Sequence, residues 1–395
     1  MDTQNTPLHI RTLRKEFWML AIANMLVTMA VYMTIPQQIN LLQSMRFTAW
    51  QQGCVMGVFG LGLFVFGPYI NYFVERYPRK RVGLLALLLL IADMGCCYYV
   101  GQTPYVADFG VQLALRFLLG VTFGMFQMVL LSTLVIDSVQ SFVRTEANHH
   151  AVWFGRFAMA LGPFAGLWAL QHVHVAHVAF LPIAFLPIAL SVLAYILVAL
   201  VGFPFKTPAE QVGFVSFDRF FLPEGSLLFI MLFAVTTIAG MLLTIPMTVS
   251  VYGLLLAGFL LALLSERFVF ANADLKSEAI TGLTSMLAAL LISYVRHTEL
   301  QGLISATLFG LGLGLIGSRF LLFFIKLSRH CQRGTSQSSF FLGWESGISC
   351  GLFLGLSVFQ GMYHSMLLIA IIWIGLLLAV YNFFVHNWYT KHRNR

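Results

Sequence analysis

The chain has 395 residues, of which 59% are hydrophobic and only 10% are charged, and its mean hydropathy is +0.84. A soluble domain of this length needs far more charged surface, so the composition excludes a soluble protein and predicts one that crosses a membrane many times. The net charge of +8 does not indicate nucleic-acid binding, because the cations lie in short loops between apolar segments and form no continuous patch.

Apolar windows of about 20 residues follow one another along the chain and predict an all-α membrane protein with twelve transmembrane helices. The windows begin near Phe17, Gln51, Val82, Asp108, Ala151, Val178, Ser226, Val249, Glu278, Leu300, Ser336 and Tyr363. The first window is too long for the apolar core of a signal peptide and has no small-residue cleavage site. We therefore expect it to be retained as the first helix.

The distribution of basic residues predicts the orientation of these helices. With both termini in the cytoplasm, 18 of the 23 Lys and Arg residues lie in inner loops and tails, and only Arg46 and Arg296 lie in outer loops. The remaining three, Arg116, Arg156 and Arg319, fall inside predicted helices. Because cytoplasmic loops of membrane proteins are enriched in Lys and Arg, we expect both termini to be cytoplasmic.

A segment with three prolines and several aromatic residues, 203–225, divides the chain in two. We expect an N-terminal six-helix bundle at 1–203, a cytoplasmic interdomain loop at 204–225 that lies on the membrane surface, and a C-terminal six-helix bundle at 226–395. A weak internal repeat supports this division, because a shift of 189 residues places Arg156 on Glu345 and Gly162 on Gly351. The two bundles are therefore expected to be pseudo-symmetric.

The loop between the second and third windows, residues 71–81, reads NYFVERYPRKR and sets four cations, Arg76, Arg79, Lys80 and Arg81, beside one acid, Glu75. It resembles the signature loop between helices 2 and 3 of the major facilitator superfamily, Gly-x-x-x-Asp-Arg-x-Gly-Arg-Lys. Asn71 and Pro78 stand where that signature has glycines, and Glu75 stands where it has Asp. The resemblance implies a gating motif on the cytoplasmic side.

Two further motifs resemble the same superfamily. Arg116-x-x-x-Gly120 lies in the fourth window and Gly162-Pro163-x-x-Gly166 in the fifth. In the family the latter is associated with proton-coupled drug exporters of twelve or fourteen helices, so the resemblance implies efflux by alternating access between two bundles. Physically, Pro163 bends its helix, and the glycines at 162 and 166 let a neighbouring helix approach closely.

Polar residues recur at helical spacing in the first and seventh windows. They are Asn24, Thr28 and Tyr32 in the first, and Thr236, Gly240, Thr244 and Thr248 in the seventh, where Thr237 is a further candidate. Such stripes are not expected to face lipid, so they contact a neighbouring helix or line a central water-filled path. The repeat makes the two helices equivalent and favours the path.

Six charged residues fall inside or at the ends of predicted helices. Inserting one charged side chain at the bilayer centre costs at least about 2.5 kcal/mol. The six are Asp93, Arg116, Asp137, Arg156, Arg319 and Glu345. Positions equidistant from a hairpin turn lie at equal height, which predicts that Asp93 is level with Arg116, Asp137 with Arg156, and Arg319 with Glu345. These are either structural ion pairs or carboxylates that bind a proton in one access state and an arginine in the other.

Three specific expectations follow from these charges. Arg76 or Arg79 reaches Asp137 and forms a cytoplasmic latch with Glu75. Glu345 is the coupling carboxylate of the second half, with Arg319 as its resting partner. Arg116 pairs with Asp93; alternatively Arg116 faces the central path while Asp93 finds water or a backbone donor.

Other patterns carry less weight. Gly312-x-Gly314-x-x-Gly317 matches a dinucleotide fingerprint but lies in an apolar helix with no preceding strand, so it indicates helix packing. The five cysteines, four in apolar segments and Cys331 in a basic loop, indicate no disulfide framework. No ATP-binding loop or electron-carrier motif is present, and we expect no cofactor.

Histidines form two small groups. His172, His174 and His177 lack the spacing of known zinc sites and have no nearby acid, so we expect no metal site. His149 and His150 are expected at the cytoplasmic membrane face beside Arg144.

The sequence thus predicts a monomeric transporter of the bacterial inner membrane that exports a small amphipathic or partly apolar compound in exchange for protons. Its partners would be the lipid bilayer, the small-molecule substrate and protons, with no nucleic acid. Alternatives are an uptake carrier or uniporter, a membrane enzyme acting on lipid, and a non-transporting sensor on the same scaffold. An enzyme would gather catalytic acids or histidines at one membrane face, and a sensor would carry a soluble output domain.

Overall fold

The computed structural model describes residues 13–140, 143–172, 181–202, 212–270, 274–296 and 298–394, with the side chains of 181–184 and 330 left out. Regular structure in these residues is helical. The helices of the first half are α1 (Lys15–Ser44), α2 (Ala49–Val65), α3 (Gly67–Arg76), α4 (Arg79–Gly101), the short η1 (Pro104–Ala107), α5 (Phe109–Val129), the π-helical η2 (Leu130–Leu134), α6 (Val135–Asp137), α7 (Arg144–His172) and α8 (Leu181–Leu200).

The second half contains η4 (Pro223–Gly225), α9 (Ser226–Leu242), α10 (Val249–Phe268), α11 (Leu275–Tyr294), α12 (Glu299–Leu327), η5 (His330–Gln332), α13 (Arg333–Ser357), α14 (Tyr363–Val380), η6 (Tyr381–Val385) and α15 (His386–His392). Each of the predicted apolar windows overlaps one of these helices. Within the described ranges, nine helical segments are long and apolar enough to cross a membrane, or ten if α2 and α3, which meet at 42°, form one span. Twelve crossings with cytoplasmic termini therefore stay a prediction.

Helix ends follow local sequence signals. Thr48 before α2 and Thr298 before α12 each form a capping box with the glutamine three residues later, Gln51 and Gln301. The Asp108 side chain accepts from the backbone N–H of Val111 at the start of α5. These caps supply acceptors for N–H groups that the first helical turn leaves unbonded.

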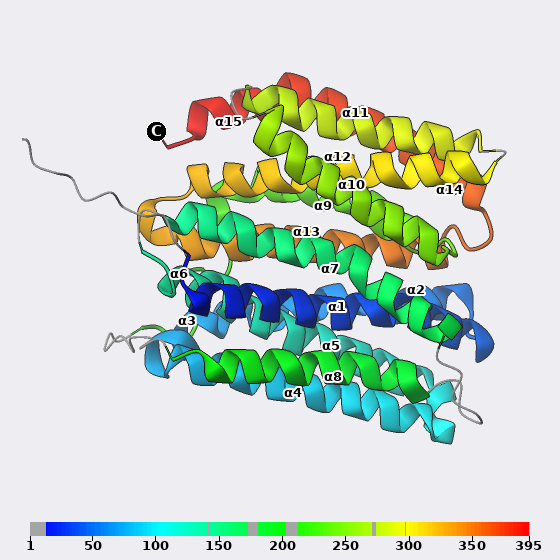
Figure 1. Cartoon of the computed structure of the whole chain (residues 1–395), viewed down its shortest axis with the longest axis horizontal. Coiled ribbons are helices and arrows are strands. Elements are labelled where there is room, and N and C mark those ends of the chain that lie inside the picture. Colours follow the sequence, from blue (N-terminus) through cyan, green and yellow to red (C-terminus); the bar gives the residue numbers. More distant parts are fainter. Residues whose placement is uncertain are drawn as a thin grey trace, which may run out of the picture.

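The long helices lie side by side along one direction, and the same pairings recur in the two halves of the chain (Figure 1). In the first half α1 packs on α7, α2 on α5, and α4 on α5 and α8; in the second half α9 packs on α13, α10 on α12, and α11 on α12 and α14. The halves meet where α2 packs on α13 and α7 on α10. The proposed domain boundaries themselves stay a prediction.

The first residues of α1 and the C-terminal helix α15 lie at the left-hand end of the bundle in Figure 1. The basic turns that precede α4 and α13 lie at this end as well. We name it the inner end, because it is the end predicted to be cytoplasmic, and the opposite end the outer end.

Repeat-related glycines make equivalent close contacts between helices. A Cβ atom at Gly162 of α7 would come within 2.6 Å of the Met29 carbonyl oxygen on α1, and one at Gly351 of α13 would overlap the Thr237 carbonyl of α9. Gly166 likewise abuts Met33. Small residues let helix backbones approach, which is the main source of packing energy between helices in lipid. Gly162 and Gly166 thus pack α7 closely on α1, as the motif containing Pro163 predicts.

The glycines of the apparent dinucleotide fingerprint also serve packing. Gly312 lies against the backbone of Gly282 on α11, and Gly314 lies against Ala262 on α10. Both are inside α12, so the interpretation as helix packing is confirmed.

Large apolar side chains cover much of the exterior, for example Leu61, Leu85, Ile230, Ile372 and Leu376, each more than half exposed. A soluble protein seldom exposes so continuous an apolar surface, whereas a helix facing lipid must. Between α8 and α9, the described part of the interdomain loop packs Phe214 against Tyr69 and Tyr72 of α3, which keeps it at the inner end.

Candidate functional site

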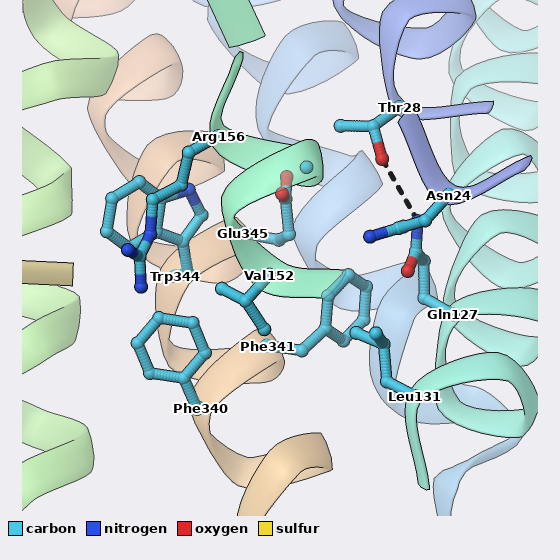
Figure 2. A pocket seen from close by; sticks show the side chains of 11 residues that line it. Asn24, Thr28, Gln127, Leu131, Val152, Arg156, Phe340, Phe341, Trp344 and Glu345 are labelled. Atoms are coloured by element: carbon cyan, nitrogen blue, oxygen red, sulfur yellow. Dashed lines mark hydrogen bonds between the residues drawn. The ribbon is translucent and has the colours of Figure 1, made fainter. Parts of the chain in front are cut away.

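A small central cavity lies between the two halves. It is lined from α1 by Asn24 and Thr28, from α5 and η2 by Gln127 and Leu131, from α7 by Val152, Gly155 and Arg156, and from α13 by Phe340, Phe341, Trp344 and Glu345 (Figure 2). Its volume of about 40 Å³ leaves room for about three water molecules. The cavity thus combines amides, a hydroxyl, two opposite charges and an aromatic wall in a small space.

Glu345 bridges the two halves through Tyr32. The Tyr32 hydroxyl on α1 donates to both carboxylate oxygens of Glu345 on α13, at 3.1 Å and 3.0 Å. Both side chains are buried, with 1% and 7% of their surface exposed. This contact joins the polar stripe predicted on the first helix to the carboxylate predicted to couple transport.

The expected partner of Glu345 was wrong. Arg319 of α12 forms its ion pair with Glu278 of α11, which is fully buried. The hairpin rule predicted only equal height, and a helix at a given height has several neighbours. Because α12 packs extensively on α11, Arg319 turns toward α11. Sequence reasoning did not count Glu278 among the buried charges, because this residue lies at the edge of an apolar window.

Arg156 does not pair with Asp137, although the sequence predicted that the two residues lie at equal height. Its guanidinium lies over the rings of Trp153, Phe340 and Trp344, with the guanidinium carbon 4.7, 5.7 and 5.7 Å from the ring centroids. Figure 2 shows this group beside Trp344 and Phe340, while the Glu345 carboxylate points away from it. Asp137 instead pairs with Arg79 at the inner end.

The polar stripe of α1 reaches the cavity, but that of α9 does not. Asn24 donates to the Ala151 carbonyl of α7, and Thr28 accepts from Gln127 of α5, at 2.8 and 3.1 Å. The Gln127 amide, within an apolar helix, was a signal that sequence reasoning missed. On α9, Thr237 bonds its own helix at Phe233 and Thr236 contacts Gly343 of α13. These threonines serve helix packing.

Asp93 and Arg116 are buried at equal height but do not form an ion pair in the described structure. Arg116 donates to Thr34 of α1 at 3.0 Å and lies over the Phe59 ring, 5.1 Å from its centroid. Neither Asp93 oxygen has a hydrogen-bond partner among the described residues. The predicted pair is thus not formed. Arg116 instead contacts α1 and α2 and does not line the central cavity, so the alternative in which it faces the central path stays a prediction.

The inner end contains the predicted contact between Arg79 and Asp137. Arg79 Nη1 lies 2.5 Å from Asp137 Oδ2, and its Nη2 donates to Glu75 at 2.9 Å. Arg76 bonds only Tyr72 in this region, and Lys80 donates to the Ala199 and Val201 carbonyls at the end of α8. Lys80 therefore caps a helix terminus.

Arg219 of the interdomain loop joins this network, which sequence reasoning had missed. Its Nη2 lies 2.5 Å from Glu75 Oε1, its Nη1 donates to the Ser132 carbonyl, and its backbone N–H donates to Thr335 of α13 at 2.8 Å. Its φ of 58° is unusual for a residue with a side chain. The loop thereby links both halves.

A second polar cluster, with His149 and Glu266 partly buried, lies between α7, α10 and α12. His149 Nε2 lies 2.9 Å from Glu266 Oε1 and 2.8 Å from the Ser318 hydroxyl, which donates to the same carboxylate at 2.6 Å. The expectation that His149 and His150 sit at the membrane face beside Arg144 stays a prediction. His174 and His177 lie outside the described residues, as do all the residues between them and His172.

The fold and site define a polytopic membrane protein with two helical halves around a central cavity. A family model described as Major Facilitator Superfamily matches residues 18–270, so the chain belongs to this superfamily. The recognition from the three motifs is confirmed, and membership places the chain among membrane transporters that act on small molecules rather than among enzymes. No curated protein matches it significantly.

Solved structures show the same fold at low sequence identity. The nucleoside transporter NupG matches with a TM-score of 0.65 and 11% identity over 94% of this chain and 100% of the other. A variant of the Escherichia coli fucose:proton symporter FucP matches with a TM-score of 0.65 and 14% identity, over 96% of this chain and 98% of the other. The human organic anion transporter MFSD10 matches with a TM-score of 0.62 and 13% identity, over 93% of this chain and 99% of the other. At such identities the likeness establishes the fold.

Proposed function

We propose that the protein is a secondary transporter in which Glu345 couples proton movement to the export of a small amphipathic compound. The observation that carries this proposal is the hydrogen bonding of Glu345, which lines the central cavity, by Tyr32 across the two halves. A buried carboxylate at this depth is costly unless it is bonded, protonated or hydrated. Its protonation therefore depends on what surrounds it.

Alternating access changes those surroundings. When the halves separate around the cavity, Tyr32 on α1 leaves Glu345 on α13, and water replaces the phenol. The proton affinity of Glu345 then differs between the two states, and a difference of this kind is what links a proton gradient to a conformational cycle. The proton and substrate gradients would then set the net direction of the cycle.

Direction and setting are further parts of the proposal. The motif Gly162-Pro163-x-x-Gly166 favours export over uptake or uniport. We place the chain in a bacterial inner membrane as a monomer with twelve crossings and cytoplasmic termini. The inner network of Glu75, Arg79 and Asp137 would act as the cytoplasmic latch.

Reconstitution into liposomes with an imposed pH gradient tests the proposal. A broad screen of compounds is added, and a pH-sensitive dye reports which additions move protons. Proton release that depends on compound supports coupling, and its sign gives the direction. A screen in which no compound moves protons, while the protein still equilibrates a substrate, would instead favour a uniporter.

The decisive variant is Glu345→Gln. We expect it to abolish uphill accumulation while sparing exchange of substrate, because an amide mimics the protonated carboxylate but cannot release a proton. Glu224→Gln, at an exposed acid near the end of the interdomain loop, is the matched control and should transport like the unaltered chain. Uphill transport by a well-expressed Glu345→Gln protein would end the assignment of this residue.

A further inference from the structure

Arg156 carries a buried guanidinium that lacks hydrogen-bond acceptors. Only 2% of the residue is exposed, and none of its Nε, Nη1 and Nη2 atoms has a hydrogen-bond partner in the described structure. The rings of Trp153, Phe340 and Trp344 surround it. Aromatic faces stabilise the positive charge, but they leave its five N–H donors unused.

The nearby acids do not supply those acceptors. Both oxygens of Glu345 accept from Tyr32. Glu266 uses one oxygen for His149 and Ser318, and its other oxygen has no partner among the described residues. No ion pair with Arg156 is present there. A buried charged donor without an acceptor is strongly unfavourable, so the site is incomplete until a group enters the cavity.

We propose that Arg156 recognises an anionic group, a carboxylate, sulfonate or phosphate, on the transported compound. A guanidinium matches such groups with two parallel hydrogen bonds. When the halves separate and widen the cavity, the apolar body of the compound would lie against Phe340, Phe341 and Leu131, which line it. This inference names the substrate class of the proposed transporter, and it rests on that proposal only for the transport step.

Binding to the purified full chain in detergent tests it without a proton gradient. The probes are naphthalene-2-carboxylate, naphthalene-2-sulfonate and phenyl phosphate, each with its uncharged amide, sulfonamide or phenol. Sodium sulfate and chloride serve as inorganic arms. Tryptophan fluorescence gives the dissociation constant, because Trp153 and Trp344 contact the guanidinium, and the melting temperature gives an independent readout. At least one organic anion should bind at least about tenfold more tightly than its uncharged counterpart.

Substitutions assign that preference to Arg156. Arg156→Gln should weaken anion binding at least about tenfold and leave the melting temperature of the free protein unchanged or higher, because it removes an unpaired buried cation. Arg156→Lys should bind anions with intermediate affinity, since lysine keeps the positive charge but cannot donate the two parallel hydrogen bonds of a guanidinium. Arg319→Gln, at a buried arginine already paired with Glu278, is the control: it should lower the melting temperature and keep the preference for anions.

The proposal is overturned by equal binding of charged and uncharged partners, by unaltered affinity in Arg156→Gln, or by absence of binding for every organic anion. Sulfate or chloride binding as tightly as the organic anions would also reject substrate recognition. A lower melting temperature of free Arg156→Gln with unchanged anion binding would indicate a structural role. If anions bind as expected but liposomes show no coupled proton movement, the proposed coupling fails and this inference stands.

Discussion

The interdomain loop is fixed to both halves at the inner end through Arg219, and we expect Arg219→Gln to loosen that end. The side chain bonds Glu75 and the Ser132 carbonyl of the first half, and the backbone N–H bonds Thr335 of the second. Because an opening of the inner end separates these elements, the bonds stabilise the closed state only.

The magnitude follows from the bonds lost. The pair of Arg219 with Glu75 is mostly buried, with 20% and 10% of the two side chains exposed, and a hydrogen bond between charged groups contributes about 1.5–3 kcal/mol. That is a shift of about 10- to 150-fold in the ratio of closed to open molecules. If about 1% of molecules are open at the inner end, the variant should raise the open fraction to between roughly 10% and 60%.

Spin labels at Tyr77 and Arg329 measure this change in a cysteine-free background. Both positions are exposed at the inner end, one in each half, so the distance between the labels lengthens when that end opens. Arg76→Gln is the matched control, because Arg76 is an exposed arginine of the same end that bonds only Tyr72 in the described network. A distance distribution that is the same in Arg219→Gln and in the control would refute the reasoning.

Two further predictions concern stability. Arg319→Gln and Glu278→Gln should each lower the melting temperature, since removing one partner of a buried pair costs about 3–5 kcal/mol, and the double variant should recover much of the loss; additive losses in calorimetry would show that the pair contributes nothing. Gly351→Ala should reduce the yield of folded protein, because the added Cβ overlaps the Thr237 carbonyl, whereas Gly95→Ala, with no atom within 4 Å of its Cβ, should be neutral or stabilising. Equal yields of the two variants in size-exclusion chromatography would contradict the proposed close packing.

Residue type and spacing along one chain were enough to predict the helical membrane fold. Apolar windows, cation placement and the loop from Glu75 to Lys80 depend on local sequence and on the energetics of lipid, which act on each segment separately. The same local information identified Glu345 and Arg156 as buried charges and Asn24, Thr28 and Tyr32 as a polar stripe. It also predicted the contact of Arg79 with Asp137, since Arg79 begins one helix and Asp137 ends another at the same predicted membrane face.

Partners across the bundle were decided only by the tertiary structure. Height in a hairpin fixes one coordinate of a side chain, whereas the direction in which it points depends on the rotation of its helix and on which neighbour is nearest. Arg319 consequently pairs with Glu278 on α11 instead of Glu345, and Glu345 meets Tyr32, which is 313 positions away. Arg156 meets three aromatic rings from two helices. No sequence period encodes such contacts, because they arise from the packing of the halves against each other.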